Sequence, residues 1–531
     1  MNDPNGPMRY KGVYHMFYQH NPKGATWGNI AWGHSVSHDL VNWVPLPLAL
    51  SPTKSYDING CWSGSATLLH GHKPVLLYTG LGPNQNQTQN LALPLNLSDP
   101  FLKHWVRSQL NPLIAPTSGN HINATSFRDP TTAWLGHDGL WRILVGSQRK
   151  DRGLALLFKS KDFVQWVKAK HPLYSAKHTG MWECPDFFPV FINSTSGVET
   201  STPHDNHFRL KHVLKLSLID LSQDYYMIGT YNQTRDSFIP DMGFEDTELS
   251  SIFRYDYGKF YASKTFYDDE KKRRILWGWV NESSVREEDV QKGWSGIQGI
   301  PRSVWLEESG KQLVQWPIEE IEKLRSRKPL IWHSKVLQPG ALLHLPGITA
   351  AQADVEVSFE VKELAKKAKE WKQSGGKMRE PQKMCGEKRG IGPFGLLVLA
   401  SKGLQEHTSV FFRIFKLNND DNNNATKFVV VMCSDQSRSS LNHKNDLSSY
   451  AAFLDVDPLH HKLSLRTLID HSVVESFGGK GQVCITARVY PTLAINDEAQ
   501  LFVFNNASSN LKLTTLTAWS MKKARVNSVK I

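Results

Sequence analysis

Apolar and aromatic residues occur along the first part of this chain in short runs, each bounded by Gly, Pro, Asn or Asp. Runs of this length, separated by turn-forming residues, are typical of β-strands. Spacing that would predict long helices is scarce before residue 317. The runs that predict strands cover residues 13–19, 74–79, 141–146, 154–159, 225–231, 260–266 and 274–280.

A short string recurs within this region. SHDLVNW (37–43) is closely matched by SKDFVQW (160–166), and weaker copies begin at Ser98 and Ser222. The copies follow one another at intervals of about 60 residues, and a period of this length in an all-β chain predicts the blades of a propeller. Five such units would end near residue 310.

The second part of the chain also predicts strands, at 353–361, 394–400, 409–415, 427–433, 473–477, 483–489 and 501–504. Strands in this arrangement, without intervening helices, favour a β-sandwich. Between the two parts, apolar residues at 318, 321 and 324 have helical spacing. We therefore predict an all-β chain: a five-bladed β-propeller (1–317), a linker helix (318–334) and a C-terminal β-sandwich (335–531).

The chain is basic, with 62 Lys and Arg against 50 Asp and Glu and a net charge of +12. A basic surface suits a polyanion such as nucleic acid, an anionic membrane or a pectin-rich cell wall. No run approaches the ~18 apolar residues of a membrane span, so we expect no membrane partner. The insertion 364–390 is rich in Lys and Arg, and we expect it to be a mobile basic loop that contributes to retention on acidic polysaccharide.

The cysteines and short motifs exclude several chemistries. The five cysteines, at 61, 184, 385, 433 and 484, form no Cys-x-x-Cys pair, which argues against a zinc ribbon or a redox motif. A P-loop, His-Glu-x-x-His and Gly-x-Ser-x-Gly are also absent from the sequence.

Asn-x-Ser/Thr sequons are more frequent than chance predicts, which favours a secreted glycoprotein. No signal peptide precedes Met1, so we expect the N-terminus of this sequence to be incomplete. The sequons are at Asn86, Asn96, Asn123, Asn193, Asn232, Asn281, Asn424 and Asn506.

Three strings each hold one carboxylate among Asn, Arg, Trp and Pro: NDPNG with Asp3, FRDP with Asp129 and WECPD with Glu183. Taken alone, they are compatible with a tight turn, an ion pair and a surface residue on a strand. Taken together, they fit sugar chemistry, which uses a nucleophile, an acid/base and a group that holds ring hydroxyls. Because aromatic residues flank Glu183, we expect its pKa to be raised, as a general acid requires.

These strings resemble glycoside hydrolase family 32, in particular the plant cell-wall invertases and fructan exohydrolases. Further matching strings are WGN (27–29), CWSG (61–64), RYDYG (254–258) and DHSVVESF (470–477). The resemblance covers essentially the whole chain. It implies a five-bladed propeller followed by a β-sandwich, in agreement with the strand pattern.

The resemblance also implies roles for individual residues. Asp3 would be the nucleophile, Glu183 the acid/base and Asp129 the transition-state stabiliser of a retaining hydrolase, with no metal and no organic cofactor. A disulfide between Cys433 and Cys484 would join two strands of the sandwich. The residues that would line the fructose pocket are Asn2, Gln19, Trp27, Trp62, Ser63 and Arg128.

Two features bear on the subgroup. Pro185 resembles the cell-wall group, since vacuolar relatives carry Val there. The invertases have an Asp, followed three residues later by Lys or Arg, that shapes the pocket for the glucose of sucrose. Here Ile219 and Ser222 occupy those positions. Asp220, one residue away, would face the other side of a strand, unless a local shift lets it substitute.

We therefore predict a β-fructofuranosidase that releases terminal β-D-fructofuranosyl units, with fructan exohydrolase activity and weak cleavage of sucrose. The alternatives are a cell-wall invertase that cleaves sucrose and a non-catalytic, invertase-like sugar-binding protein. We expect a monomer in the cell wall or apoplast. Its partners would be fructan or sucrose and a candidate acidic wall polysaccharide, and not nucleic acid.

Overall fold

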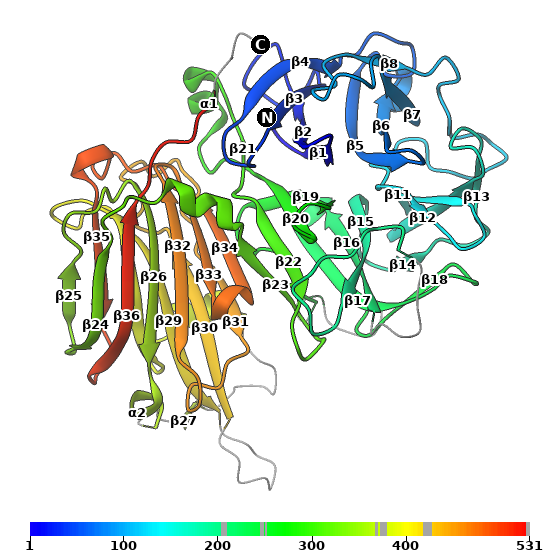
Figure 1. The fold of residues 1–531 in the computed structure, drawn as a ribbon. Coiled ribbons are helices and arrows are strands. Elements are labelled where there is room, and N and C mark those ends of the chain that lie inside the picture. The colour runs from blue at the N-terminus through cyan, green and yellow to red at the C-terminus, as the bar shows by residue number, and fades with distance from the viewer. Residues whose placement is uncertain are drawn as a thin grey trace, which may run out of the picture.

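The computed structural model describes residues 1–202, 210–244, 249, 252–366, 370–371, 380–417 and 427–526. Five antiparallel sheets follow one another around a central axis, and two larger sheets stack into a sandwich beside them (Figure 1). The all-β class, with a five-bladed propeller followed by a sandwich, is confirmed. No helix in the described part of the chain is long and apolar enough to cross a membrane.

The propeller strands are β1 (Pro4–Tyr10), β2 (Val13–His20), β3 (Ala31–Ser37) and β4 (Val44–Leu50) in the first sheet; β5 (Gly60–Leu69), β6 (Lys73–Leu81), β7 (Gln87–Pro94) and β8 (Trp105–Arg107) in the second; β9 (Phe127–Arg128), β10 (Trp134–Leu135), β11 (Trp141–Arg149), β12 (Arg152–Ser160), β13 (Trp166–Lys168) and β14 (Tyr174–Ala176) in the third; β15 (Trp182–Phe191), β16 (Leu210–Leu218), β17 (Gln223–Asn232) and β18 (Ser237–Pro240) in the fourth; and β19 (Phe260–Asp268), β20 (Arg273–Val280), β21 (Ile297–Gln298), β22 (Arg302–Leu306) and β23 (Leu313–Pro317) in the fifth.

The sandwich strands are β24 (Leu330–Leu337), β36 (Leu511–Ser520), β26 (Gln352–Glu360), β32 (Leu463–Asp470), β33 (Val473–Gly478) and β34 (Val483–Arg488) in one sheet, and β25 (Ala341–His344), β35 (Gln500–Asn505), β28 (Ile391–Ala400), β29 (Thr408–Leu417), β30 (Lys427–Asp435), β31 (Tyr450–Leu454) and β27 (Glu370–Trp371) in the other. The described helices are short: α1 (Arg286–Lys292), α2 (Lys362–Ala365), α3 (Pro381–Cys385) and the 3₁₀ helices η1 (Pro83–Gln85), η2 (Ile219–Leu221), η4 (Glu319–Leu324), η5 (Gly479–Gly481) and η6 (Asn496–Glu498).

The expected linker helix (318–334) is the short 3₁₀ helix η4. Its apolar residues, Ile318, Ile321 and Leu324, are three residues apart, and a 3₁₀ helix places such residues on one face. Ile318 and Ile321 are buried between the propeller and the sandwich. The sandwich begins with β24 at Leu330, which is earlier than the predicted boundary at 335.

The recurring string forms the same turn in the first and third sheets. Asp39 accepts the backbone N–H groups of the second and third residues after it, and Asp162 does the same. The residue that follows each Asp has a positive φ, 62° at Leu40 and 65° at Phe163. The weak copy that begins at Ser222 is not equivalent, because its Asp224 lies within β17; interpreting it as a repeat was wrong.

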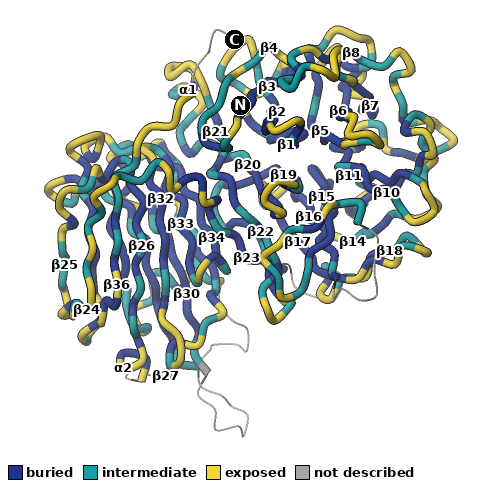
Figure 2. The backbone as a smooth tube through the Cα atoms, viewed as in Figure 1, coloured by how far each residue is buried: buried dark blue, intermediate teal, exposed yellow. Residues whose placement is uncertain are grey.

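Buried residues lie along the strands, and exposed residues lie mainly in the connections (Figure 2). Tyr14 and Trp277 of the propeller pack with Leu468 and Phe477 of the sandwich in one apolar cluster. The two parts of the chain therefore share a core.

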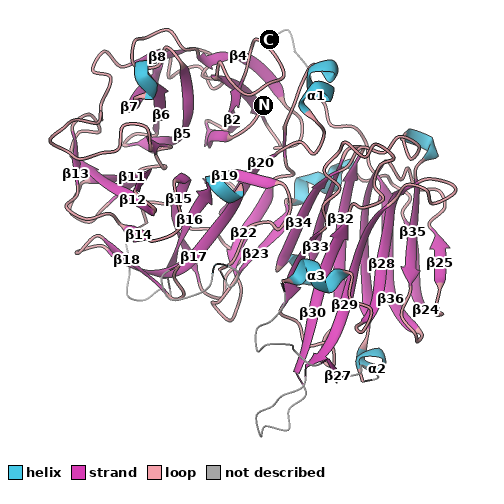
Figure 3. Cartoon of the chain, turned by 180° about the vertical axis from the view of Figure 1, so that it is seen from behind, coloured by secondary structure: helices cyan, strands magenta, loops and turns pink. Residues whose placement is uncertain are grey.

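The predicted disulfide between Cys433 and Cys484 was wrong, because Cys433 has a different partner. Cys433 of β30 is bonded to Cys385 at the end of α3, and Cys484 is a buried free thiol. Cys433 packs with Met384 on the sheet face that α3 covers (Figure 3), whereas Cys484 packs with residues of the propeller. Cys433 and Cys484 thus belong to different layers and cannot be joined.

Part of the expected basic loop within 364–390 lies outside the described residues, which here omit 367–369 and 372–379. The described remainder includes α3, which the Cys385–Cys433 disulfide ties to β30.

Candidate active site

The first strand of four blades carries an irregularity where it approaches the propeller axis. A β-bulge leaves residues without a ladder partner and turns their side chains in new directions. In this way, residues that would alternate between the faces of a blade can point along the central axis. The register shifts lie between Asn5 and Met8, Trp62 and Gly64, Glu183 and Asp186, and Tyr261 and Lys264.

The third blade reaches the axis differently. Its strand β9 ends at Arg128, and Asp129 follows with φ 67°, in the left-handed region. The backbone N–H of Asp129 donates to the hydroxyl of Thr79 (2.8 Å). Left-handed backbone is uncommon for a non-glycine residue, and such residues occur frequently at functional sites.

Asp3 is held by a closed set of side chains. The Asn2 amide donates to Asp3 Oδ1 (3.1 Å), and the Ser63 hydroxyl donates to Oδ2 (2.6 Å). Gln19 joins these two donors, since its amide nitrogen donates to Ser63 (2.6 Å) and its oxygen accepts from Asn2. The carboxylate of Asp3 therefore has a fixed orientation.

Glu183 receives two donors from neighbouring blades. Arg128 Nε lies 2.9 Å from Oε1, and the Tyr261 hydroxyl lies 2.7 Å from Oε2. The Arg128 guanidinium also lies 5.8 Å from the ring centre of Trp62. Glu183 thus has one charged and one neutral donor.

Cys184 connects the three carboxylates. Its backbone N–H donates to Asp129 Oδ2 (2.9 Å), and its Sγ lies 3.6 Å from Oδ2 of both Asp3 and Asp129. Burial raises the pKa of the Cys184 thiol well above its usual value, so the thiol stays protonated and can donate to these oxygens. Asp3 and Asp129 therefore both contact Cys184, and the Glu183 carboxylate is close enough for its charge to interact with both of them.

Burial raises the pKa of each of these three carboxyls. For Asp3 the hydrogen bond from Ser63 opposes this effect, and the negative charge of Glu183 adds to it. For Glu183 and Asp129 the positive charge of Arg128 is the main opposing cause. Three close carboxyls with raised pKa values favour a site in which one carboxyl keeps its proton while another is ionised.

Two family models match the chain: "Glycosyl hydrolases family 32 N-terminal domain" over residues 1–317 and "Glycosyl hydrolases family 32 C terminal" over residues 320–520. The chain belongs to glycosyl hydrolase family 32. The family resemblance inferred from the sequence is thereby confirmed, and the chain is a glycoside hydrolase.

Several family 32 members are closely similar over almost the whole chain. An insoluble isoenzyme of beta-fructofuranosidase from Arabidopsis thaliana is 58% identical, covering 99% of this chain and 88% of the relative. A fructan 6-exohydrolase from Beta vulgaris is 55% identical, with 99% and 86% covered. The crystal structure of fructan 1-exohydrolase IIa from Cichorium intybus aligns with a TM-score of 0.93 at 49% identity, with 99% and 96% covered.

The structure brings the predicted pocket residues of this family 32 chain to the carboxylates. Asn2, Gln19, Ser63 and Arg128 are all buried. Trp27 is different: its side chain is 61% exposed, and its ring centre lies 5.8 Å from that of Trp62. Trp27 therefore lies at the outer rim of the carboxylate site. Trp62 contacts both Trp27 and Arg128 and so connects this rim to the interior of the site.

The stretch expected to determine specificity forms a turn. Residues 219–221 are the 3₁₀ helix η2 between β16 and β17, and Ser222 has φ 50°. Ile219 is 40% exposed. A methyl group placed on Gly180 would lie 2.5 Å from Asp220 Oδ2, so this carboxylate lies beside the segment that leads to Glu183. The expectation that Asp220 faces away was based on a strand, and a turn does not impose that alternation.

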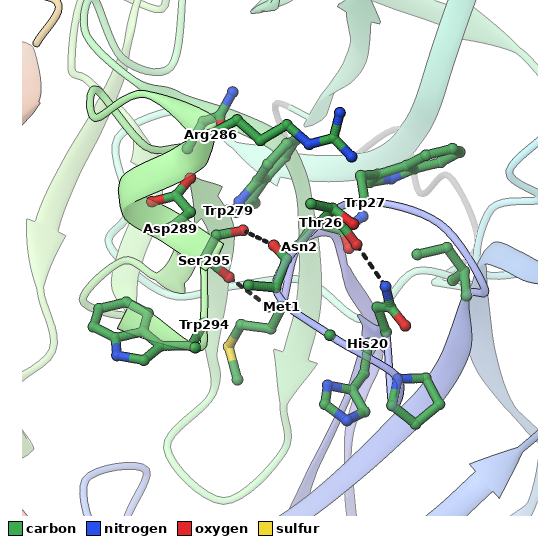
Figure 4. Close-up of a pocket in the computed structure, with 17 residues that line it drawn as sticks. Met1, Asn2, His20, Thr26, Trp27, Trp279, Arg286, Asp289, Trp294 and Ser295 are labelled. Carbon is green, nitrogen blue, oxygen red and sulfur yellow. Dashed lines mark hydrogen bonds between the residues drawn. The ribbon is translucent and has the colours of Figure 1, made fainter. Parts of the chain in front are cut away.

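A separate depression of about 690 Å³ opens beside the site (Figure 4). It lies between the loop after β2 and the segment that contains α1, and its lining includes Trp27, Trp279 and Trp294. Asn2 is shared with the carboxylate site, but Asp3, Asp129 and Glu183 are not among the lining residues.

Sequence reasoning missed Tyr261 and Thr79, whose hydroxyls contact Glu183 and the backbone of Asp129. Both lie in apolar strands, where a single hydroxyl gives no signal of its own. Among the described residues, no group of three or more His, Cys, Asp or Glu is arranged to hold a metal ion.

Proposed function

We propose that this protein is a retaining β-fructofuranosidase that removes terminal β-D-fructofuranosyl units. The observation that carries this proposal is that Asp3 and Asp129 both contact Cys184, the residue that directly follows Glu183. Retaining glycosidases need a nucleophile and a proton donor roughly 5–5.5 Å apart, on opposite sides of the scissile bond.

In the first step, Asp3 attacks the anomeric C2 of the fructosyl unit. Glu183, whose pKa is raised by burial, gives its proton to the leaving oxygen as the C2–O bond breaks. Asp129 would hold ring hydroxyls as positive charge develops on the ring. The product of this step is a fructosyl ester of Asp3.

In the second step, the ionised Glu183 removes a proton from water. The water oxygen bonds to C2, and the bond to Asp3 breaks. Arg128 and Tyr261 donate to Glu183 and so stabilise its carboxylate in this step. Asp3 and Glu183 then return to their starting states.

A non-catalytic sugar-binding protein is the alternative from another class. Such a protein has no need for a partly buried nucleophile and a partly buried acid, whose desolvation costs free energy. The presence of Asp3, Asp129 and Glu183 in one polar network therefore favours the enzyme.

The decisive experiment is fructose release from sucrose, inulin-type and levan-type oligomers, with the anomer of the first product identified by NMR. We expect β-fructofuranose to appear first, because two displacements at C2 retain configuration. Release of the α anomer would reject the double displacement. Absence of fructose with every substrate would reject the enzyme.

We further propose that fructans are preferred over sucrose. Ile219 places an exposed apolar side chain in the turn η2, where the resemblance expects an Asp. A hydrogen bond to a charged group is worth about 1.5–3 kcal/mol, so the glucose of sucrose would lose roughly one to two orders of magnitude in kcat/KM for each such bond. The alternative is an invertase in which Asp220 takes this role.

The variant Ile219→Asp with Ser222→Lys separates these alternatives. We expect it to raise kcat/KM for sucrose at least about tenfold, and to change the value for inulin-type oligomers less. Asp220→Asn is the matched variant. If it loses most of the sucrose cleavage, and if the wild type prefers sucrose to inulin-type oligomers, the protein is an invertase.

We also propose a location in the cell wall, retained by acidic polysaccharide. Relatives from Arabidopsis thaliana and Pisum sativum are named insoluble or cell wall isozymes. A basic depression of about 680 Å³ on the propeller provides a candidate surface. Its basic lining residues are Lys159, Lys161, Lys168, Lys170, His171 and Arg235.

A further inference from the structure

The bulges that aim Glu183 and Tyr261 leave backbone groups without ladder partners. In β15 the pairing passes from Glu183 to Asp186, and in β19 it passes from Tyr261 to Lys264. Cys184 has φ 43° and Ala262 has φ 52°, so both bulges pass through left-handed backbone. Buried polar backbone groups must find other partners, because leaving them unpaired is costly.

One buried ammonium satisfies carbonyls from both bulges. Lys215 Nζ donates to the Cys184 carbonyl (3.1 Å) and to the Ser263 carbonyl (2.7 Å). The side chain has 0% exposure. Lysine is almost never buried to this extent without specific partners.

One buried carboxylate satisfies the N–H groups of the second bulge. Asp224 accepts the N–H of Ala262 (3.2 Å) and of Ser263 (2.8 Å). Its Oδ2 lies 3.3 Å from Lys215 Nζ, and Ser217 connects the same two groups, accepting from Lys215 (2.9 Å) and donating to Asp224 (2.5 Å).

The two bulges are therefore both tied to this ion pair, and Lys264 of β19 adds a further link by donating to the Pro185 carbonyl (3.2 Å). One bulge carries Glu183, and the other carries Tyr261, whose hydroxyl donates to Glu183. We propose that Lys215 and Asp224 are a positioning pair that holds Glu183 and Tyr261 in register with each other. The inference rests on the proposed role of Glu183 as acid/base.

Other charged and titratable groups also face Glu183. Arg128 donates to it, and Asp129, Asp3 and Cys184 lie around it. None of these four depends on the bulge in β19. The Tyr261 contact does, so loss of the pair should shift the pKa of Glu183 through Tyr261, while loss of the Lys215–Cys184 contact also loosens the β15 bulge.

The test is the double variant Lys215→Met with Asp224→Asn, which removes both charges and leaves no buried ion unpaired. We expect kcat for fructose release to fall about 10- to 100-fold, since displacements near 1 Å can cost this much. Loss of the Tyr261 donor should raise the pKa of Glu183. The alkaline limb of kcat/KM, which requires protonated Glu183, should then move up by at least ~0.5 pH unit.

Two comparisons make the result specific. Arg466→Met with Asp354→Asn removes a buried pair in the sandwich, 2.8 Å apart, whose carboxylate Arg325 shares, and should lower Tm without moving the pH profile. Tyr261→Phe should move the alkaline limb as the double variant does, and the combined triple variant should move it little further.

A pH profile that overlays the wild type, or a triple variant whose shift is the sum of the two, would overturn the positioning role. If the wild type releases no fructose, the proposed function fails separately. The pKa of Glu183 can still be measured by carboxyl ¹³C NMR against Glu183→Gln. An unchanged value in the double variant would overturn the inference without any turnover.

Discussion

Individual residues at the site are oriented by side chains from several blades. Asp3 is the clearest case, since Asn2, Gln19 and Ser63 fix both of its oxygens. A carboxylate held in this way loses little entropy when it attacks, which is one source of catalytic rate.

We expect Asp3→Asn and Glu183→Gln each to lower kcat by at least ~100-fold, because each removes a group that forms or breaks a bond to hydrogen or carbon. Both substitutions keep the size of the side chain and one acceptor oxygen, so circular dichroism and Tm should remain close to wild type. Glu308→Gln, at an exposed turn, is the control and should keep full activity. Either active-site variant retaining a tenth of wild-type activity would exclude the assigned role.

The burial of Asp129 should also be visible in stability. Its pKa is raised above the unfolded value by burial, so folding favours its protonated form. The stability that protonated Asp129 contributes to the folded state is present at low pH and is lost as pH rises through the folded-state pKa. Above the pKa of an unfolded Asp, the Asp129 carboxyl therefore lowers the free energy of unfolding relative to its value at acid pH.

Asp129→Asn should accordingly raise the free energy of unfolding at pH 7, by on the order of 1 kcal/mol, while abolishing activity. The difference should vanish below about pH 4, where an unfolded Asp is protonated too.

Asp354→Asn is the contrasting variant. It leaves Arg325 and Arg466 without their shared carboxylate and should destabilise the protein. Thermal unfolding at both pH values measures these differences.

At the scale of elements, the close approach of two blades positions β15. A methyl group on Gly146 of β11 would lie 2.1 Å from the Trp182 carbonyl, immediately before Glu183. Backbone cannot move aside as a flexible side chain does, so β11 and β15 can approach only because residue 146 has no side chain.

Gly146→Ala should therefore separate the blades, lower kcat/KM at least about tenfold and lower Tm by several degrees. Gly119→Ala serves as the control, because nothing lies within 4 Å of its added methyl group. It should change stability by less than about 0.5 kcal/mol. Equal effects of the two substitutions on kcat/KM would show that the approach of β11 does not position Glu183.

Strands were largely predictable from local pattern, and each of the seven propeller strands expected from apolar runs is present, for example β6 (Lys73–Leu81) and β19 (Phe260–Asp268). The linker was predicted less well, since a three-residue apolar spacing suits a 3₁₀ helix as well as an α-helix. The disulfide partner of Cys433 could not be deduced from sequence, because it depends on which sheet face α3 covers.

The site residues that stand in recognisable motifs could be named from the sequence. The residues that belong to the site only through their contacts in the folded chain could not. Asp3, Asp129 and Glu183 stand in recognisable strings, so their roles could be proposed from the sequence alone. Lys215 and Asp224 are charged residues next to apolar or aromatic residues in β16 and β17, a signal that could have been noticed. Their shared contacts arise only when β16, β17 and β19 pack together.

At the scale of the molecule, a buried arginine joins the propeller to the sandwich. Arg302 of β22 donates to Asp256 (2.9 Å), and to Glu475 (2.9 Å) and Thr486 (2.8 Å) of the sandwich. Arg302 and Asp256 both have 0% exposure. Together with the shared apolar cluster, this junction fixes the sandwich against the fifth blade.

The surface of the molecule carries its charge unevenly. The acidic groups in the basic depression are already engaged, as Asp162 holds its own turn and Asp236 pairs with Arg142. Lys161, Lys170 and Arg235 are exposed there and have no ion-pair partner within the described ranges. β12 runs from Gly153, beside the Trp182 side chain, to Ser160, so Lys161 lies roughly 25 Å along the strand from Gly153, at about 3.3 Å per residue.

Replacing Lys161, Lys170 and Arg235 by Gln should lower the salt concentration that elutes the protein from polygalacturonate, and should leave kcat unchanged. Replacing exposed Lys54, Lys73 and Lys150 by Gln removes the same charge elsewhere and should have a smaller effect. Equal shifts in the two variants would mean that net charge alone, and not this depression, determines retention.

The turns at Asp39 and Asp162 have a consequence for the order of folding. Their hydrogen bonds join residues two or three positions apart. By contrast, Glu183 depends on partners 55 and 78 positions away. Local contacts form early and long-range contacts late, so the outer hairpins can form before the residues around the propeller axis come together. The candidate active site then assembles after the outer hairpins, and on heating we expect turnover to be lost before the blades themselves melt.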